Sequence, residues 1–183
     1  MIPVEHLHQA WRHLIGEEPI PPLRVDRARL FEECRSYEVD FDEVKGRWGG
    51  VDVLVNNAGL GHNTGLVEGE TEKWREMLEL NVLALSVCTR EALAQMREKG
   101  DRGHIVHVSS MAGHRVPPGS GMYSATKYAV RALTEGLRRE LRERGSKVRV
   151  TAVSPGFVRT EFHDVYYGDA KPADPYGGLE VLE

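Results

Sequence analysis

The sequence predicts an α/β protein with a doubly wound, parallel β-sheet, and three observations lead to this fold class. Short apolar segments rich in β-branched residues recur along the chain. Helical segments of about ten residues or more separate them, as parallel pairing of the strands requires. Polar or glycine-rich residues follow each apolar segment, which is typical of ligand sites at the carboxyl ends of parallel strands.

The composition is that of an ordinary globular domain. The 183 residues are 40% hydrophobic and 28% charged, with a formal net charge of −4. We therefore expect one domain over residues 1–183. No apolar run approaches the roughly 18 residues that a membrane-spanning helix needs, and the N-terminal segment does not resemble a signal peptide. These features predict a cytoplasmic protein with no membrane span.

The expected elements follow from the spacing of apolar residues. A helix is predicted over 4–16, and after a proline-rich loop a short strand is predicted over 23–25. Asp26 is a good N-cap for a one-faced helix that continues to Trp48 and ends at a glycine pair. The other predicted elements are strands over 51–55, 105–108 and 148–153 and helices over 71–99 and 123–144.

The predicted strands end in residues suited to a binding site. These are Asp26, residues 56–59 with the sequence Asn-Asn-Ala-Gly, the pair Ser109 and Ser110, and residues 154–156 with the sequence Ser-Pro-Gly. Because the carboxyl ends of parallel strands lie at one edge of the sheet, we expect these residues to line a single crevice. Ser109 is expected to be a structural partner at the strand end rather than a reacting hydroxyl.

Tyr123 and Lys127 carry the chemistry expected in this crevice. They are four residues apart in a predicted helix, so they share one helix face. A fixed positive charge near a phenol lowers the pKa of the phenol from about 10 and makes it a usable general acid or base. Ser110 adds a hydroxyl at a neighbouring strand end. The three groups together suit the polarisation of a carbonyl oxygen and the delivery of a proton to it.

These motifs, in this order, resemble those of the short-chain dehydrogenase/reductase family. Asn81, Ser110, Tyr123 and Lys127 are similar to its catalytic tetrad, and the resemblance covers about residues 4–160. It implies a Rossmann-like sheet and a nicotinamide cofactor. The cofactor-binding residues that the resemblance implies are Asp26, Asn56, Asn57, Ala58, Gly59, Tyr123, Lys127, Pro155, Gly156, Val158 and Thr160.

The resemblance also implies a reaction, which is the NAD(P)(H)-dependent interconversion of a carbonyl and a secondary alcohol in a small-molecule substrate. Tyr123 would exchange a proton with the substrate oxygen, and Ser110 would bind the developing oxyanion. Lys127 would hold the ribose hydroxyls and keep Tyr123 acidic. Asn81 would hold a water that links Lys127 to solvent through a bend in its helix. Residues 81–85 and 113–116 resemble the hydroxysteroid and farnesol dehydrogenase branch, which implies a preference for NADP(H).

Two features depart from the family pattern. The family's G-x-x-x-G-x-G turn does not occur in the sequence, so the first βαβ unit of the fold is expected to be absent. No helix and no final strand are expected after Thr160. Because amides at a helix N-terminus normally hold the pyrophosphate, we expect this chain to bind a dinucleotide weakly.

A second class of function is therefore kept open, that of a catalytically inactive chain acting as a subunit-interaction module. Ala125, Ala129, Ala132 and Gly136 form a strip of small residues that permits close helix approach, either between copies or onto the sheet. Members of the family usually pair through the two long helices, so a homo-oligomer is expected.

Two other classes of function are not expected. The basic residues between 138 and 149 alternate with glutamates, as on a solvated helix face, which argues against nucleic-acid binding. The histidines near the N-terminus share no face with acidic partners, so no metal site is predicted.

Overall fold

The structure is a computed structural model, and it describes residues 40–168, 172, 174 and 177. The chain divides into two compact units, residues 1–43 and 44–183. The helix expected over 4–16, the strand expected over 23–25 and Asp26 lie outside the described residues. Of the helix expected over 26–48, the described part is α3, Phe41–Trp48.

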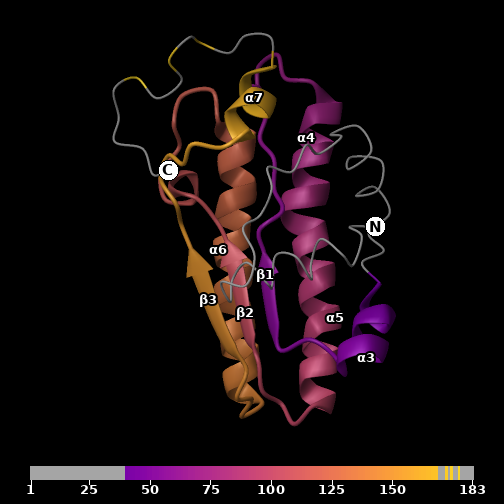
Figure 1. The fold of residues 1–183 in the computed structure, drawn as a ribbon. Helices are drawn as coiled ribbons and strands as arrows, with labels where there is room; N and C mark the ends of the chain where they lie inside the picture. The colour runs from indigo at the N-terminus through magenta and orange to yellow at the C-terminus, as the bar shows by residue number, and fades with distance from the viewer. Residues whose placement is uncertain (1–39, 169–171, 173, 175–176, 178–183) are drawn as a thin grey trace. The chain divides into compact units, whose positions relative to one another are not determined.

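The second unit contains a parallel sheet, as the sequence predicts. Its described strands are β1 (Val53–Asn56), β2 (His104–Val108) and β3 (Arg149–Val153), hydrogen-bonded in the order β1-β2-β3. β1 and β2 pair so that Asn56, the last residue of β1, lies opposite His107 in β2. Figure 1 shows the strands side by side and pointing in the same direction.

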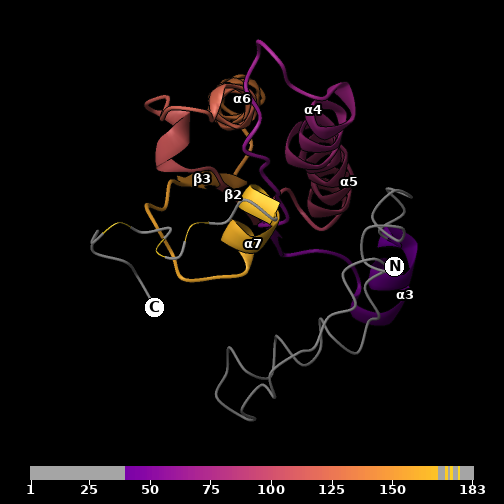
Figure 2. The same ribbon diagram turned by 90° about the horizontal axis from the view of Figure 1, so that it is seen from above.

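The long helices cover one face of this sheet. They are α4 (Thr71–Leu78), the π-helix η1 (Glu79–Ala84), α5 (Leu85–Glu98) and α6 (Gly121–Glu143). Viewed from above in Figure 2, α4, α5 and α6 lie on the same side of the strands. The helix expected over 71–99 is therefore present, but a π-helical segment divides it.

None of the helices in the described residues is long and apolar enough to cross a membrane.

The core lies between the strands and these helices. Met96, Ile105 and Val130 are fully buried there, each with 0% of its surface exposed. Alternate strand residues point to the other face of the sheet, where Val53 and Val55 stay more than half exposed. Because side chains alternate along a strand, the same register that buries Ile105 also aligns His107 with the helices.

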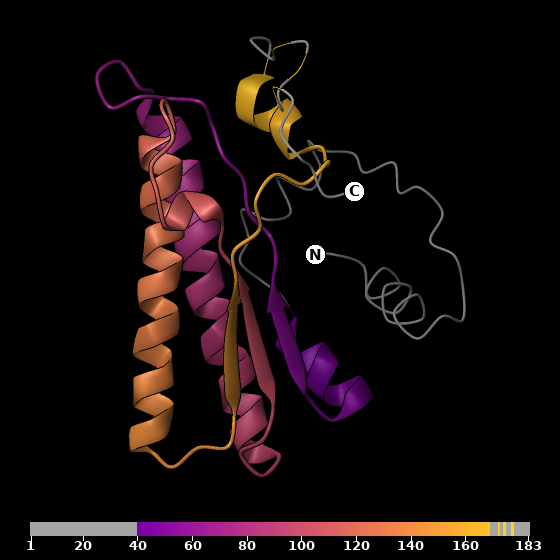
Figure 3. The ribbon, with the colours of Figure 1, turned by 90° about the vertical axis from the view of Figure 1, so that its left-hand side faces the viewer.

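Two short elements complete the described structure at the carboxyl ends of the strands. The 3-10 turn η2 (Met111–Gly113) follows β2, and helix α7 (Phe162–Tyr167) follows β3. The sequence predicts no helix after Thr160, so α7 corrects that expectation. In Figure 3, α7 lies beyond the carboxyl ends of the strands, at the edge where the binding site is expected.

Candidate active site

The strand ends converge as the sequence predicts. The Lys127 Nζ in α6 donates a hydrogen bond to the main-chain oxygen of Val108, the last residue of β2, at 3.1 Å. The amide of Met111, after β2, donates to the oxygen of Pro155, after β3, at 2.9 Å. A Cβ placed on Gly59, after β1, would lie 3.3 Å from Lys127 Nζ. The segments that follow β1 and β2 thus meet around Lys127, and the segment after β3 is hydrogen-bonded to the one after β2.

Ser110, Tyr123 and Lys127 form the chemical centre of this convergence. Tyr123 and Lys127 lie one helical turn apart in α6, and the Lys127 Nζ is 5.8 Å from the centre of the Tyr123 ring. The side chains of Ser110 and Tyr123 are hydrogen-bonded. The Ser110 hydroxyl also accepts a hydrogen bond from the amide of Ala112, which fixes it at the start of η2. A hydroxyl, a phenol and an ammonium are therefore brought together, as predicted.

The acidity of Tyr123 differs from the expectation. Burial raises the pKa of Tyr123 above its usual value, and the hydrogen bond with Ser110 opposes this only in part. The predicted lowering of this pKa by Lys127 is not met in this structure, because the ammonium is directed at the Val108 oxygen and not at the phenol oxygen. Tyr123 consequently holds its proton at neutral pH, as a general acid must.

Lys127 is a buried cation with 5% of its surface exposed. Burial lowers the pKa of Lys127 from 10.5 to about 8. A lysine of this kind is still mostly charged at neutral pH, but it changes its charge readily when its surroundings change. Perturbed lysines in a crevice are typical of functional sites.

Asn81 holds the segment after β1 against these residues. It lies in η1 and is 1% exposed. Its Oδ1 accepts a hydrogen bond from the Leu60 amide at 2.9 Å, and its Nδ2 donates to the Leu60 oxygen at 2.7 Å and to Thr126 Oγ1 at 3.0 Å. One amide side chain thus satisfies both main-chain groups of Leu60. π-helical turns are frequent at functional sites, and here the turn carries a predicted site residue.

Ser109 has the structural position expected of it. Its side chain is 3% exposed and donates a hydrogen bond to the main-chain oxygen of Lys127 at 3.1 Å. Its amide donates to the oxygen of Val153 at 2.7 Å. The neighbouring Gly113 packs so closely here that a Cβ would lie 2.8 Å from the Lys127 oxygen. These contacts fix the main chain of α6 beside β2 and leave Ser110 as the available hydroxyl.

The aromatic side chains of α7 were missed by the sequence analysis. The Tyr123 ring centre is 5.4 Å from that of Phe162 and 6.1 Å from that of Tyr166. The oxygen of Tyr166 accepts a hydrogen bond from the amide of Asn63 at 2.8 Å, which ties α7 to the loop after β1. Burial and the neighbouring tyrosines raise the pKa of Tyr166 to about 12. An aromatic wall therefore borders the candidate general acid.

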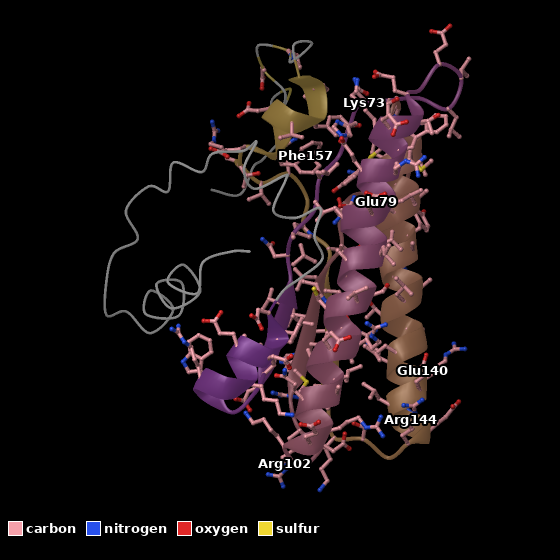
Figure 4. All side chains as sticks on the ribbon, turned by 90° about the vertical axis from the view of Figure 1, so that its right-hand side faces the viewer. Lys73, Glu79, Arg102, Glu140, Arg144 and Phe157 are labelled. Atoms are coloured by element: carbon pink, nitrogen blue, oxygen red, sulfur yellow. The ribbon has the colours of Figure 1, made fainter. Side chains whose placement is uncertain are left out.

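The remaining predicted cofactor residues lie at the end of β1 and in the segments that follow β1 and β3. Asn56, Asn57, Ala58 and Gly59 lie at the end of β1 and in the loop that follows it. Thr160 precedes α7, and its hydroxyl accepts a hydrogen bond from the amide of Phe162 at 3.3 Å. Phe157, in the segment after β3, lies beside α7 and stacks on His163 (Figure 4). Pro155, Gly156 and Val158 belong to the same segment after β3. Asp26 lies outside the described residues.

Fold and site together define an α/β protein of the Rossmann class, and comparison with known families agrees. The family model for the short chain dehydrogenase matches residues 31–169. The chain belongs to the short-chain dehydrogenase/reductase family. The resemblance noted in the sequence is thereby confirmed, as is the predicted fold class.

Individual relatives support the same conclusion. The chain is 57% identical over 125 residues to dehydrogenase/reductase SDR family member 11 of Bos taurus, with 67% of this chain and 49% of the relative covered. It is 47% identical over 156 residues to farnesol dehydrogenase of Aedes aegypti, with 84% and 63% covered. The chain spans about half the length of the first of these relatives.

A solved structure of serine dehydrogenase complexed with NADP+ resembles the fold, with a TM-score of 0.72 and 32% identity. The similarity covers 95% of this chain and 68% of that one.

Proposed function

We propose that the protein is an NAD(P)(H)-dependent oxidoreductase that interconverts a carbonyl and a secondary alcohol in a small-molecule substrate. The observation that carries this proposal is the meeting of Ser110, Tyr123 and Lys127 at the carboxyl ends of parallel strands. A protonated phenol beside a hydroxyl suits the protonation of a carbonyl oxygen. Membership of the family supports the same reaction class.

The residues present suit the nicotinamide half of the cofactor. The Lys127 ammonium and the Tyr123 hydroxyl are donors suited to ribose hydroxyls, and the main chain at Gly59 passes so close that a Cβ there would lie 3.3 Å from Lys127 Nζ. When bound, a nicotinamide cofactor supplies or accepts the hydride. A preference for NADP(H) is supported by the NADP+ complex of the similar serine dehydrogenase.

Each residue then has a role that follows from its surroundings. In reduction, Tyr123 gives its proton to the carbonyl oxygen while the Ser110 hydroxyl holds that oxygen in place. Lys127 orients the ribose hydroxyls with its positive charge. Asn81 holds Leu60, and with it the loop after β1, in position.

This proposal is tested by a single-atom change in the general acid. A carbonyl-reductase screen with NADPH and NADH first identifies a reduced substrate. Tyr123→Phe removes only the hydroxyl, and we expect kcat/KM to fall by about 10²-fold or more. Tyr128→Phe in the same helix is the matched control, because Tyr128 is 41% exposed, and it should keep its activity. Full turnover by Tyr123→Phe would refute the mechanism.

The second candidate is an inactive chain that associates with copies of itself through α5 and α6, and the surface of α6 favours it. In the strip of small residues, Ala125 and Ala132 are exposed, and a Cβ on Gly136 would meet open space. Part of this strip therefore stays exposed and is available for contact with another copy. A groove of roughly 830 Å³ runs between α5 and α6, with Glu140 and Arg144 along its lower part (Figure 4).

A thermal-shift measurement separates the two candidates. A ligand present at a hundred times its dissociation constant stabilises a protein by about 2.7 kcal/mol, whereas one far below its dissociation constant has almost no effect. The 183-residue protein is melted with and without millimolar NADPH and NADH. The weak binding expected from the missing glycine-rich turn predicts a small shift. A rise of several degrees contradicts that expectation and favours the oxidoreductase.

A further inference from the structure

Four polar side chains form a continuous chain of hydrogen bonds in the core between the sheet and the helices. Asn56 at the end of β1 donates from Nδ2 to Thr89 Oγ1 in α5 at 2.9 Å. Thr89 Oγ1 is 3.1 Å from His107 Nε2, and His107 Nδ1 is 2.9 Å from Thr134 Oγ1 in α6. Thr134 donates to the oxygen of Val130 at 2.7 Å. This chain of hydrogen bonds therefore links β1, β2, α5 and α6.

The middle of this hydrogen-bond chain is buried. His107 and Thr134 are each 1% exposed, and Thr89 is 8% exposed. A buried polar atom without a partner costs more free energy than a hydrogen bond contributes, so each donor and acceptor here has to be satisfied. This requirement allows the protons along the chain to be assigned.

The hydrogen bonds of the Thr134 hydroxyl show which ring nitrogen of His107 carries a hydrogen. It has one hydrogen, which it donates to the Val130 oxygen, so it is an acceptor toward His107. His107 Nδ1 therefore carries a hydrogen. Burial and the nearby Arg138 guanidinium lower the pKa of His107 from 6.5 to about 4, so the ring is neutral and its Nε2 is an acceptor.

The other half of the chain follows from the acceptor at His107 Nε2. Thr89 has to donate its single hydrogen to Nε2, so the Thr89 oxygen accepts from the amide nitrogen of Asn56. If the Asn56 amide were reversed, Thr89 would donate to its oxygen and His107 Nε2 would lose its donor. The tautomer of His107 and the orientation of Asn56 are therefore linked.

We infer that His107, as the neutral tautomer with the hydrogen on Nδ1, is a positioning residue that fixes Asn56 and the loop 57–59. Asn56 is the register partner of His107 in the sheet, and the loop begins directly after it. The same loop reaches Lys127 at Gly59 and is held at Leu60 by Asn81. His107 anchors the near end of the loop as Asn81 anchors the far end. The link to cofactor binding rests on the proposed function.

The structure offers a matched control in the same strand. His104 also pairs with a threonine, since its Nε2 is 2.8 Å from Thr151 Oγ1. It lies at the start of β2, far along the strand from the loop after Asn56. His107→Phe removes two histidine–threonine hydrogen bonds and His104→Phe removes one, but only the first variant breaks the link to Asn56. His107→Gln keeps one donor and one acceptor, and Thr89→Val removes the oxygen that bonds both Asn56 and His107.

The first measurement is made without cofactor. Long-range proton–nitrogen correlation of the histidine rings should show the hydrogen of His107 on Nδ1. Hydrogen exchange at the amides of Asn57 and Leu60 should be faster by about fivefold to tenfold in His107→Phe and in Thr89→Val. It should be unchanged in His104→Phe and close to wild type in His107→Gln. An Nε2–H tautomer, or equal exchange in His107→Phe and His104→Phe, would overturn the inference.

The second measurement tests the link to the cofactor. The dissociation constant for NADPH should rise by about fivefold to tenfold in Thr89→Val and His107→Phe and stay within about twofold in His104→Phe. If wild type binds no NADPH or NADH while the exchange pattern is as expected, the proposed function fails and the positioning role stands. An unchanged dissociation constant in variants with faster loop exchange would overturn the cofactor part of the inference.

Discussion

At the scale of single residues, the candidate site contains a phenol and an ammonium whose pKa values burial shifts in opposite directions, each toward the neutral form. Tyr123 keeps its proton because burial raises its pKa, and Lys127 loses its proton more easily because burial lowers its pKa to about 8. An acid that is protonated beside a cation with a labile charge suits proton delivery in the direction of reduction. The same shift makes the stability of the protein depend on pH.

Lys127 should make the folded protein more stable as the pH rises above about 8. The unfolded chain, in which lysine has its ordinary pKa of 10.5, binds more protons than the folded chain between pH 8 and 10.5, so the free energy of unfolding increases over this interval. The full difference corresponds to about 3 kcal/mol. Urea unfolding at pH 7.0, 8.5 and 9.5 measures the part of this rise that develops below pH 9.5.

Lys127→Met is the test of this assignment. The variant should be more stable than wild type at pH 7, because it has no buried charge, and the difference should become smaller as the pH approaches 10. Lys147→Met, which changes a lysine outside the site, should leave the pH dependence of wild type unchanged. Parallel pH profiles for wild type and Lys127→Met would contradict the lowered pKa.

At the scale of elements, the π-helix η1 depends on a contact that is distant in sequence. Asn81 makes three hydrogen bonds, two of them to the main chain of Leu60, which is 4% exposed. In Asn81→Leu these buried groups lose their partners, so we expect the free energy of unfolding to fall by about 3 kcal/mol. Ser86→Ala, which removes one bond to a helix carbonyl, should cost about 1 kcal/mol or less. Equal losses in the two variants would contradict the role of Asn81.

The elements that the sequence predicted are those with long or regular patterns. The strands after residue 50 and the two long helices were found close to their predicted limits, because apolar spacing reports directly on the face that is buried. The family resemblance implied a bend in the helix at Asn81, but apolar spacing did not show the π-helical break at Glu79–Ala84, since it accompanies hydrogen bonds from Asn81 to a residue 21 positions away. Helix α7 has six residues, too few to show a helical period.

The candidate site, like the fold, was predictable only in part. The convergence of Ser110, Tyr123 and Lys127 follows from strand ends and helix spacing, which are visible in the sequence. The direction of the Lys127 ammonium was not predictable, because its acceptor is the main-chain oxygen of Val108. His107 was missed for a similar reason. A histidine inside a strand gives no signal unless its partners in two other elements are known.

At the scale of the whole molecule, the surface of α5 and α6 is the one on which the proposed self-association would seat a second copy. The groove between these helices is lined by Leu133, Leu137 and the small residues Ala132 and Gly136, and Leu133 is 38% exposed. Thr89 and His107 lie at its inner side. A second copy seated on this surface would therefore lie close to the hydrogen-bond chain that positions Asn56.

The proposed self-association predicts that one charged side chain on α6 will separate the copies. Ala132 is exposed, so Ala132→Arg should leave the fold intact, as measured by urea unfolding, while sedimentation velocity shifts from dimer to monomer at micromolar concentration. Val67→Arg, at a loop residue that is 95% exposed, is the matched control and should remain dimeric. Val55→Lys tests the exposed face of the sheet, because Val55 is 55% exposed there. A wild-type monomer at all concentrations, or a dimer that only Val55→Lys separates, would show that α5 and α6 do not form the pairing surface.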